Sequence, residues 1–481
     1  MKQLKNKIYM TRNNVKRIFI TLSFLVVVMT TTAQKAKYVF LMIGDGMGVN
    51  QVGMTERYMA AMNGSNGRVP LCMAQFPVSG LAHTYSKSYG TTDSAAGGSA
   101  LSTGQKTTNG TVAMDSAKAV PTTSIATIAK ERGMAVGVTT SVSIDHATPA
   151  VFYAHAPNRR TYYEIGCQLP ASGYDFFGGA WFLKPQGDDG KQPSIDEMIG
   201  KAGYTKIKGY DEYLKHGKSH DKVILTQTDE KAKVYNRALP YAIDRDEDDL
   251  QLPQITAAAI DFLYNKSKDK GFFLMVEGGQ IDWACHANDA GTTVVEVMDF
   301  DKAISEAYNF YLQHPDETLI VISADHETGG LSPGRDNTYE LQLQRLGMQK
   351  CSQSALTKKI LAALNDKQKP FTYDEMKNLV AENTGLWSSI EMKESDEAEI
   401  KAAYDKTMQG KAENVKSEYF TDELIAVAAL KVLNRKAFVG WTTGGHTSTF
   451  VPVFAVGVGA ERFSGVIDNT DIPKNILEIM R

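Results

Sequence analysis

The chain has 481 residues, of which 43% are hydrophobic, with 52 lysines and arginines against 55 aspartates and glutamates. This composition excludes a disordered chain, a fibrous repeat and a protein with many membrane spans. The net charge of −3 argues against a general nucleic-acid binder, which carries a basic excess. The length suits one large α/β domain or about two to three smaller ones.

The N-terminus predicts a secretory signal. Residues 1–33 include six basic and no acidic residues, and an apolar run from Ile18 to Met29 precedes Ala33. We predict cleavage after Ala33 and a periplasmic or secreted location. A membrane anchor is the alternative, disfavoured because the run is shorter than the ~20 residues of a spanning helix. The remaining chain, 34–481, has 46 basic and 55 acidic residues and a net charge of −9.

Five β-branched runs predict buried strands, and segments of helical period, such as 122–132 and 255–266, lie between them. Apolar strands that alternate with helices indicate a doubly wound, mostly parallel α/β sheet with helices on both faces. The polar, largely helical stretch from about 335 to 440 is expected to be an insertion into a single domain, 34–481. The predicted strands are 38–43, 134–140, 272–276, 318–322 and 452–456.

Side chains that can ligate a metal lie next to each predicted strand. In open α/β sheets, ligands bind beyond the carboxyl ends of the strands. Four carboxylates at one edge would repel one another strongly without cations, so the pattern predicts a metal site. In chain order the candidates are Asp45, His146 with Thr148, Glu277, Asp282 with His286, Asp325 with His326, and His446.

Each motif has a simpler interpretation when it is taken alone. The Gly44–Gly48 segment could be a dinucleotide turn, but its spacing is G-x-G-x-G and its aspartate would repel a pyrophosphate. Asp282 and His286, four residues apart, could be a surface pair on one helix face. Asp325 could cap a turn, and His446 could be a packed loop histidine. Only the combination favours a metal site.

Ser94, in the sequence Asp-Ser-Ala-Ala-Gly-Gly, is the candidate nucleophile. The small residues after it favour a closely packed helix, whose N-terminus would attract a phosphate oxygen. The alternative is an ordinary Asp/Ser helix cap. The G-x-S-x-G motif of α/β-hydrolases is absent around it. A neighbouring divalent metal can activate a serine without a histidine base.

The cysteines support no other chemistry. An oxidising compartment allows disulfides, and four cysteines permit three pairings. No Cys-x-x-Cys pair supports a thiolate zinc site. Cys285 beside His286 could form a nucleophile and base, but neighbours on a helix point in different directions. The four are Cys72, Cys167, Cys285 and Cys351.

Together these motifs resemble the alkaline phosphatase family, from about Lys37 to about Gly459. The resemblance implies a doubly wound fold in which 335–440 is the family's crown, a phosphorylated serine at Ser94, and a phosphate-clamping arginine at Arg159. It also implies two zinc ions and one magnesium ion. The implied ligands are Asp282, His286 and His446 for the first zinc ion, Asp45, Asp325 and His326 for the second, and Asp45, Thr148 and Glu277 for magnesium.

Two residues near the implied metal sites, His146 and Trp283, stand at positions where the family varies. His146 lies near the implied magnesium site, where some bacterial members have aspartate and vertebrate members have histidine. Trp283 stands where other members have a lysine or histidine that contacts phosphate through water. Because tryptophan carries no charge, we expect weaker phosphate binding or faster release.

The sequence therefore predicts an exported enzyme that hydrolyses phosphate monoesters, without a nucleic-acid partner or a membrane span after signal removal. The resemblance also allows a homodimer. A sulfatase would need a Cys/Ser-x-Pro-x-Arg segment, which the Ser94 region lacks. Phosphodiesterases of the superfamily generally lack the third metal site and the clamping arginine. A non-catalytic binding protein would have no reason to retain Ser94 with a full ligand set.

Overall fold

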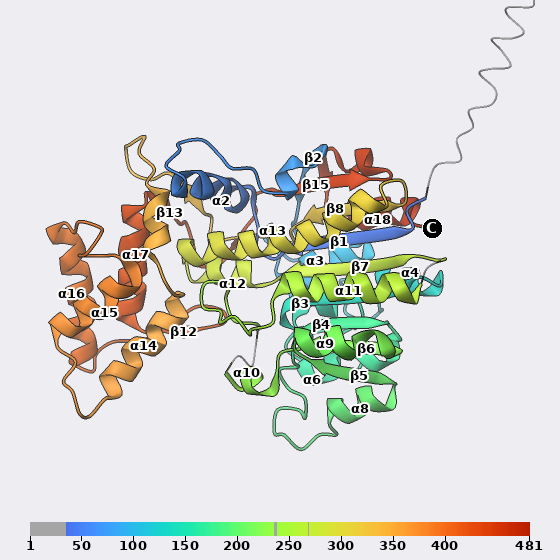
Figure 1. Ribbon diagram of the computed structural model, residues 1–481, viewed down its shortest axis with the longest axis horizontal. Coiled ribbons are helices and arrows are strands. Elements are labelled where there is room, and N and C mark those ends of the chain that lie inside the picture. The colour runs from blue at the N-terminus through green and yellow to red at the C-terminus, as the bar shows by residue number, and fades with distance from the viewer. Residues whose placement is uncertain (1–34, 235–237, 268) are drawn as a thin grey trace, which may run out of the picture. The chain divides into compact units, whose positions relative to one another are not determined.

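A ten-stranded sheet runs through the computed structural model, which describes residues 35–234, 238–267 and 269–481 (Figure 1). The strand order is β16-β2-β15-β8-β1-β7-β3-β4-β6-β5. Neighbours from β8 to β5 pair in parallel, whereas β15 is antiparallel to β8 and β2. The strands are β1 (Tyr38–Gly44), β2 (Val78–His83), β3 (Ala135–Ser143), β4 (Phe176–Ala180), β5 (Tyr204–Lys208), β6 (Lys222–Thr226), β7 (Phe272–Gly278), β8 (Thr318–Ser323), β15 (Val451–Gly457) and β16 (Gly465–Asp468).

The central strands form because their sequences are apolar on both faces. Every residue of β1, β7 and β8 is buried, as expected for a parallel sheet covered on both sides. The five predicted strands correspond to β1, β3, β7, β8 and β15. In the register, Ile43 at the end of β1 lies between Glu277 of β7 and Ser323 of β8. The three strands therefore end at one level, and the residues after them gather at one edge.

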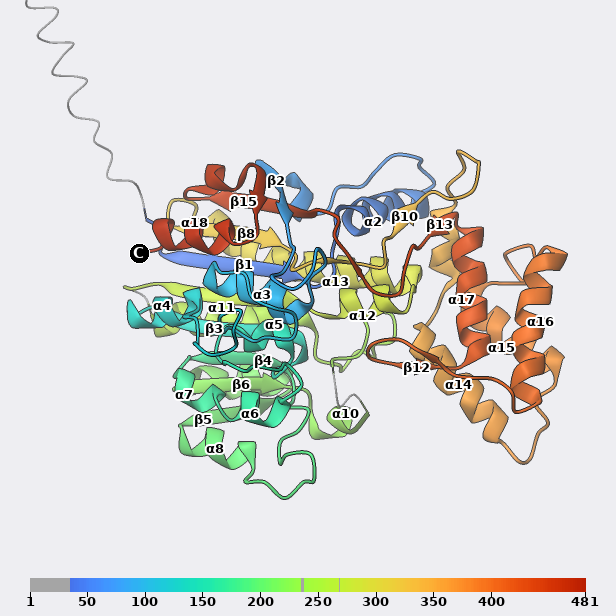
Figure 2. The same ribbon diagram turned by 180° about the vertical axis from the view of Figure 1, so that it is seen from behind.

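Helices cover both faces of the sheet, so the predicted doubly wound α/β fold is confirmed. Helices α11 (Leu252–Lys266) and α13 (Ala290–Gln313) pack on the face turned to the viewer in Figure 1. Figure 2 shows the opposite face, covered by α3 (Ser94–Thr103), α4 (Ile125–Glu131) and α5 (Ala147–Ala150). Helices α4 and α11 correspond to the two helical segments predicted at 122–132 and 255–266.

Residues 343–440 form a largely helical region beyond the carboxyl ends of the strands (Figures 1 and 2). Its apolar side chains, among them Leu356, Ile360 and Leu430, form a cluster that includes Val294 of α13. The region therefore packs directly on the core beside the site. Its elements are η3 (Leu343–Met348), α14 (Gln353–Asn365), α15 (Tyr373–Thr384), α16 (Glu394–Met408), β11 (Val415–Lys416), β12 (Thr421–Asp422), α17 (Leu424–Lys436) and β13 (Val439–Gly440).

The remaining elements are short connections and edges of the unit Ala36–Arg481. The predicted signal, 1–33, lies outside the described residues. Among the helices that are described, none is long and apolar enough to cross a membrane. The remaining elements are α2 (Val49–Met62), η1 (Met73–Gln75), α6 (Tyr162–Gly166), α7 (Leu169–Ser172), α8 (Ile195–Lys201), α9 (Tyr210–His216), η2 (Gly217–Ser219), α10 (Asp229–Val234), α12 (Gln280–His286), β9 (Glu327–Thr328), β10 (Ser332–Pro333), β14 (His446–Thr447), η4 (Ala460–Phe463) and α18 (Asp471–Ile479).

Candidate metal centre and nucleophile

Four carboxylates converge where β1, β7 and β8 end. Asp45 follows β1, Glu277 lies in β7, Asp282 is on α12 and Asp325 follows β8, and all four are 0% exposed. Gly46 makes this approach possible, because its φ is 72° and a Cβ there would lie 2.8 Å from the Cα of Asp282. The strand ends thus bring together the acidic residues that the sequence pattern singled out.

Two histidines complete a first group with Asp282. Each of Asp282, His286 and His446 offers one ligand atom, and these atoms lie within 4.8 Å of one another. Nδ1 of His286 lies 2.6 Å from the carbonyl oxygen of Gly444, and Nδ1 of His446 lies 2.8 Å from that of Thr92. A carbonyl only accepts hydrogen bonds, so both Nδ1 atoms carry the proton and donate.

That tautomer turns two lone pairs toward each other. Nε2 of His286 and Nε2 of His446 are 3.1 Å apart, and Asp282 carboxylate oxygens lie 3.3 Å and 3.7 Å from them. Burial works to lower the pKa of His286, but the charge of Asp282 outweighs it and raises the pKa to about 9. Acceptors facing each other at this distance need a proton or a cation between them. The group has the donor set of a zinc site.

A second group contains Asp45, Asp325 and His326, whose ligand atoms also lie within 4.8 Å of one another. Nε2 of His326 is 3.4 Å from Asp45, 3.3 Å from Asp325 and 3.2 Å from Oγ of Ser94. Ser94 begins α3, with Asp93 as its N-cap residue, as the sequence predicts. Sequence spacing gave no sign of the contact between Ser94 and His326, because 232 residues separate them.

Thr328, which the sequence interpretation missed, connects the first two groups. Its hydroxyl donates to Oδ1 of Asp282 at 2.5 Å, because a carboxylate has no proton to give. The same oxygen lies 3.2 Å from Nδ1 of His326 and must accept that proton. His326 is therefore held in the tautomer whose Nε2 lone pair faces the carboxylates and Ser94.

A third group lies beside Asp45. Asp45, His146 and Glu277 each offer one ligand atom within 4.8 Å of the others. Burial raises the pKa of Glu277, and the Thr148 hydroxyl, on α5, lies close enough to Glu277 to oppose that rise. The resemblance placed His146 near this group, and the structure brings one of its ring nitrogens within 4.8 Å of the ligand atoms of Asp45 and Glu277. Nε2 of His146 lies 3.2 Å from Nη2 of Arg159. Because a guanidinium only donates, this nitrogen accepts the hydrogen bond, and the ring of His146 is neutral.

Arg159 reaches the same centre from the loop after α5. Its Nη1 donates to Oδ2 of Asp93 at 3.3 Å and lies 3.4 Å from Oγ of Ser94. The side chain is 8% exposed, and burial, which by itself lowers the pKa, is outweighed by Tyr419 and Asp93, so the pKa is raised. A charged, planar fork thus stands beside the Ser94 hydroxyl.

The buried carboxylates crowd one another. Burial, followed by the charges of Asp325 and Asp282, raises the pKa of Asp45 well above its usual range, and burial raises that of Glu277 to about 7. Both Oδ atoms of Asp45 and Oδ2 of Asp325 have no hydrogen-bond partner among the described residues. Buried acceptors without donors are stabilised by cations, so the residues present fit bound metal ions.

The family model for alkaline phosphatase matches residues 36–176 and 233–481. The chain belongs to the alkaline phosphatase family. Alkaline phosphatase 3 of Bacillus subtilis is 33% identical, over 92% of this chain and 89% of its own. The unmatched residues 177–232 hold most of β4, its neighbour β6 and the edge strand β5.

Solved alkaline phosphatases share the fold. The cold-active enzyme of a psychrophilic Shewanella species is 29% identical, with a TM-score of 0.76, and covers 92% of this chain and 100% of its own. The enzyme of the Antarctic bacterium TAB5 is 26% identical, with a TM-score of 0.63, and covers 93% and 98%. A variant of the Antarctic enzyme with one histidine replaced by aspartate holds Mg in a site called M3. Family membership makes this chain a metal-binding phosphoric monoester hydrolase.

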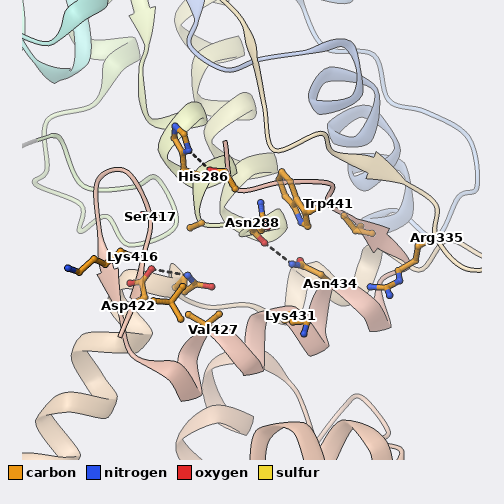
Figure 3. Close-up of a pocket in the computed structure, with 15 residues that line it drawn as sticks. His286, Asn288, Arg335, Lys416, Ser417, Asp422, Val427, Lys431, Asn434 and Trp441 are labelled. Atoms are coloured by element: carbon orange, nitrogen blue, oxygen red, sulfur yellow. Dashed lines mark hydrogen bonds between the residues drawn. The ribbon is translucent and has the colours of Figure 1, made fainter. Parts of the chain in front are cut away.

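A cavity of ≈ 440 Å³ opens beside His286, between the core and the largely helical region 343–440 (Figure 3). Val427, Lys431 and Asn434 of α17 line one side, and Val415–Ser417 line another. The cavity borders the first group, whose His286 lies at its edge. It gives this member of the family an open space next to the buried metal groups.

The cysteines take no part in the site. All four are free thiols, and Cys285 and Cys351 are buried. Burial raises the pKa of Cys285 far above its ordinary value, and its sulfur lies 3.7 Å from both Gln51 and Thr293. A thiol held protonated in this way is a poor nucleophile, which agrees with the choice of Ser94.

Proposed function

We propose that this chain is an exported alkaline phosphatase that hydrolyses phosphate monoesters through a phosphoserine at Ser94, with two zinc ions and one magnesium ion. The observation that carries the proposal is the position of the Ser94 hydroxyl. It lies 3.2 Å from His326 of the second group and 3.4 Å from Arg159. A nucleophile, a cation-binding group and a phosphate-binding fork therefore meet at one oxygen.

The donor chemistry supports the assignment of the metals. Zinc prefers histidine and carboxylate ligands, and magnesium prefers hard oxygens and keeps several waters. When bound, the ions supply Lewis-acid stabilisation of the phosphoryl oxygens and favour the alkoxide form of the attacking serine. The proposed holders are Asp282, His286 and His446 for one zinc ion, Asp45, Asp325 and His326 for the other, and Asp45, Thr148 and Glu277 for magnesium, with His146 beside them.

The protein's own residues then perform two displacements. Ser94 releases its hydroxyl proton to solvent as Oγ attacks phosphorus, the bond between phosphorus and the ester oxygen breaks, and the leaving alkoxide takes up a proton from solvent. Water next attacks the phosphoserine, the bond between phosphorus and Oγ breaks, and Ser94 regains a proton as inorganic phosphate leaves. Ser94 sits at the first turn of α3, where backbone N–H groups favour a negatively charged oxygen.

Arg159 binds the phosphoryl group throughout this path. Its planar fork matches two phosphate oxygens, and Asp93 holds Nη1 beside Ser94. The positive charge of three divalent ions and Arg159 exceeds the negative charge of the four carboxylates by three. The site therefore attracts anionic esters locally, although the chain without its signal carries a net charge of −9.

Export and assembly complete the proposal. We propose cleavage after Ala33, a periplasmic or secreted location, and the family's homodimer. Mass spectrometry of the protein secreted by cells expressing the full chain tests the cleavage site, and light scattering tests the dimer. A mature N-terminus other than Gln34 would refute the predicted site.

The catalytic proposal is tested with a chromogenic phosphate monoester and the matching diester, before and after chelation. We expect fast monoester turnover, a slow diester rate, and loss of both on chelation. Ser94→Ala is expected to retain full metal content by elemental analysis and to lose most of the activity. A preference for the diester would favour a phosphodiesterase, and wild-type rates in fully metallated Ser94→Ala would refute the nucleophile.

A further inference from the structure

A hairpin of the largely helical region 343–440, which the sequence predicts to be an inserted region, reaches into the centre of the site. Strands β11 and β12 pair antiparallel, and the turn between them is closed by the Ser417 N–H, which donates to the Phe420 carbonyl at 3.0 Å. The hairpin is anchored on α14, because Asp422 accepts from Gln353 at 2.8 Å and from Thr357 at 3.2 Å. Its tip, residues 418–419, is thus held in a fixed place.

Tyr419, at this tip, lies against four residues of the candidate site. Its ring stacks on Trp283, with ring centres 4.4 Å apart and planes inclined by 19°. Its ring centre lies 5.5 Å from that of His286, in an edge-to-face contact, and 5.6 Å from that of His146, with the planes inclined by 60°. Its hydroxyl accepts a hydrogen bond from Nη2 of Arg159 at 3.3 Å.

These contacts fix both ends of the Arg159 fork. Asp93 holds Nη1 from one side, whereas His146 and Tyr419 hold Nη2 from the other. An arginine side chain loses rotamer freedom when it is fixed in one position, so prior fixation favours the geometry that receives two phosphate oxygens. The aromatic face of Trp283 in turn fixes the ring of Tyr419.

We propose that Tyr419 is a positioning residue for phosphate binding: its hydroxyl orients Arg159, and its ring, stacked on Trp283, holds that hydroxyl in place. The proposal rests on the proposed role of Arg159. It gives Trp283, which lacks the charge of a lysine, a function as the platform for a residue from the inserted region. The hairpin thereby makes the insertion part of the phosphate site.

The test uses the metallated enzyme with a chromogenic monoester as substrate and inorganic phosphate as competitive inhibitor. Tyr419→Phe keeps the ring and removes the hydroxyl, and Tyr419→Leu removes both. We expect the phosphate inhibition constant to rise about three- to tenfold in Tyr419→Phe and further in Tyr419→Leu. Tyr241→Phe, which removes the hydroxyl of a buried tyrosine in the same cluster, is the matched control and is expected to leave it unchanged.

A double-mutant comparison separates positioning from a general structural effect. In an Arg159→Ala background, Tyr419→Phe is expected to change phosphate inhibition no further, because its partner is already gone. The same fold-change in both backgrounds, or no change in Tyr419→Phe alone, would overturn the role of Tyr419. Unchanged phosphate inhibition in Arg159→Ala by itself would instead refute the role of Arg159 and with it this proposal.

Discussion

Replacing Thr328 with valine tests whether one hydroxyl fixes the ligand geometry of two metal groups. Valine has nearly the shape of threonine, so the substitution removes the oxygen with little change in packing. Two interactions disappear, the 2.5 Å bond to Asp282 and the 3.2 Å contact with Nδ1 of His326. Each interaction orients a proposed ligand, one in each zinc group. His326 would then be free to turn or to change tautomer.

The expected effect is a loss of metal affinity at both groups. Removing a residue that orients a metal ligand typically weakens binding about 10- to 100-fold. Because Thr328 contributes one contact to each group, we expect about tenfold for each zinc ion, or about 1.4 kcal/mol. Titration of the metal-free protein with zinc in the presence of a competing chelator measures both constants.

Thr139→Val is the matched control for this experiment. Thr139 is also buried, but its hydroxyl donates to the Met275 carbonyl within the sheet, away from the proposed ligands. The control is expected to bind zinc as the wild type does. Equal zinc affinity in Thr328→Val and wild type would refute the argument, and weakening of only one site would confine the role of Thr328 to that group.

Three further outcomes follow from charge. His146→Asp is expected to raise magnesium content, measured by elemental analysis, because a carboxylate oxygen joins those of Asp45 and Glu277; unchanged content would refute it. The chelated protein is expected to melt at a higher temperature as the pH falls from 7 toward 4.5. Burial raises the pKa of Glu277 to about 7, so over this range the folded state binds a proton that the unfolded state does not. A melting temperature that falls over this range would contradict the prediction. Asp396, whose pKa burial works to raise, is held at about 2 by its basic neighbours. Asp396→Asn is therefore expected to cost about 2 kcal/mol by urea unfolding at pH 7, and the difference should vanish as the pH falls from about 4 to 2.

The sequence predicted the parts of the site that follow strong strands. The runs before Asp45, Glu277 and Asp325 are mostly apolar, and parallel strands bring their carboxyl ends to one edge. Ser94 was predictable because small residues and an aspartate mark the start of its helix. At these positions the local sequence pattern predicts the same strands and helix start that the structure contains.

Other features depend on tertiary packing and left no clear local pattern. Strands β4, β5 and β6 escaped prediction because β4 contains two glycines, the edge strand β5 carries two lysines, and β6 beside it is short and begins with Lys222. Tyr419 lies in a polar stretch far from every predicted motif, and only the packing of the hairpin on α14 brings it to Arg159. The fold determines which residue Tyr419 contacts, so sequence spacing alone does not predict its hydrogen bond with Arg159.

The hydrogen bonds around the histidines prepare the site before any ion binds. His286 and His446 donate to backbone carbonyls, and His326 faces Thr328, so all three direct Nε2 inward. Such fixed lone pairs beside buried carboxylates are unfavourable by themselves, and the folded state bears that cost until cations neutralise it. Metal binding is therefore coupled to stability, since any ion that binds only the folded state also stabilises it. The same arrangement that makes the metal-free site repulsive favours the binding of metal ions.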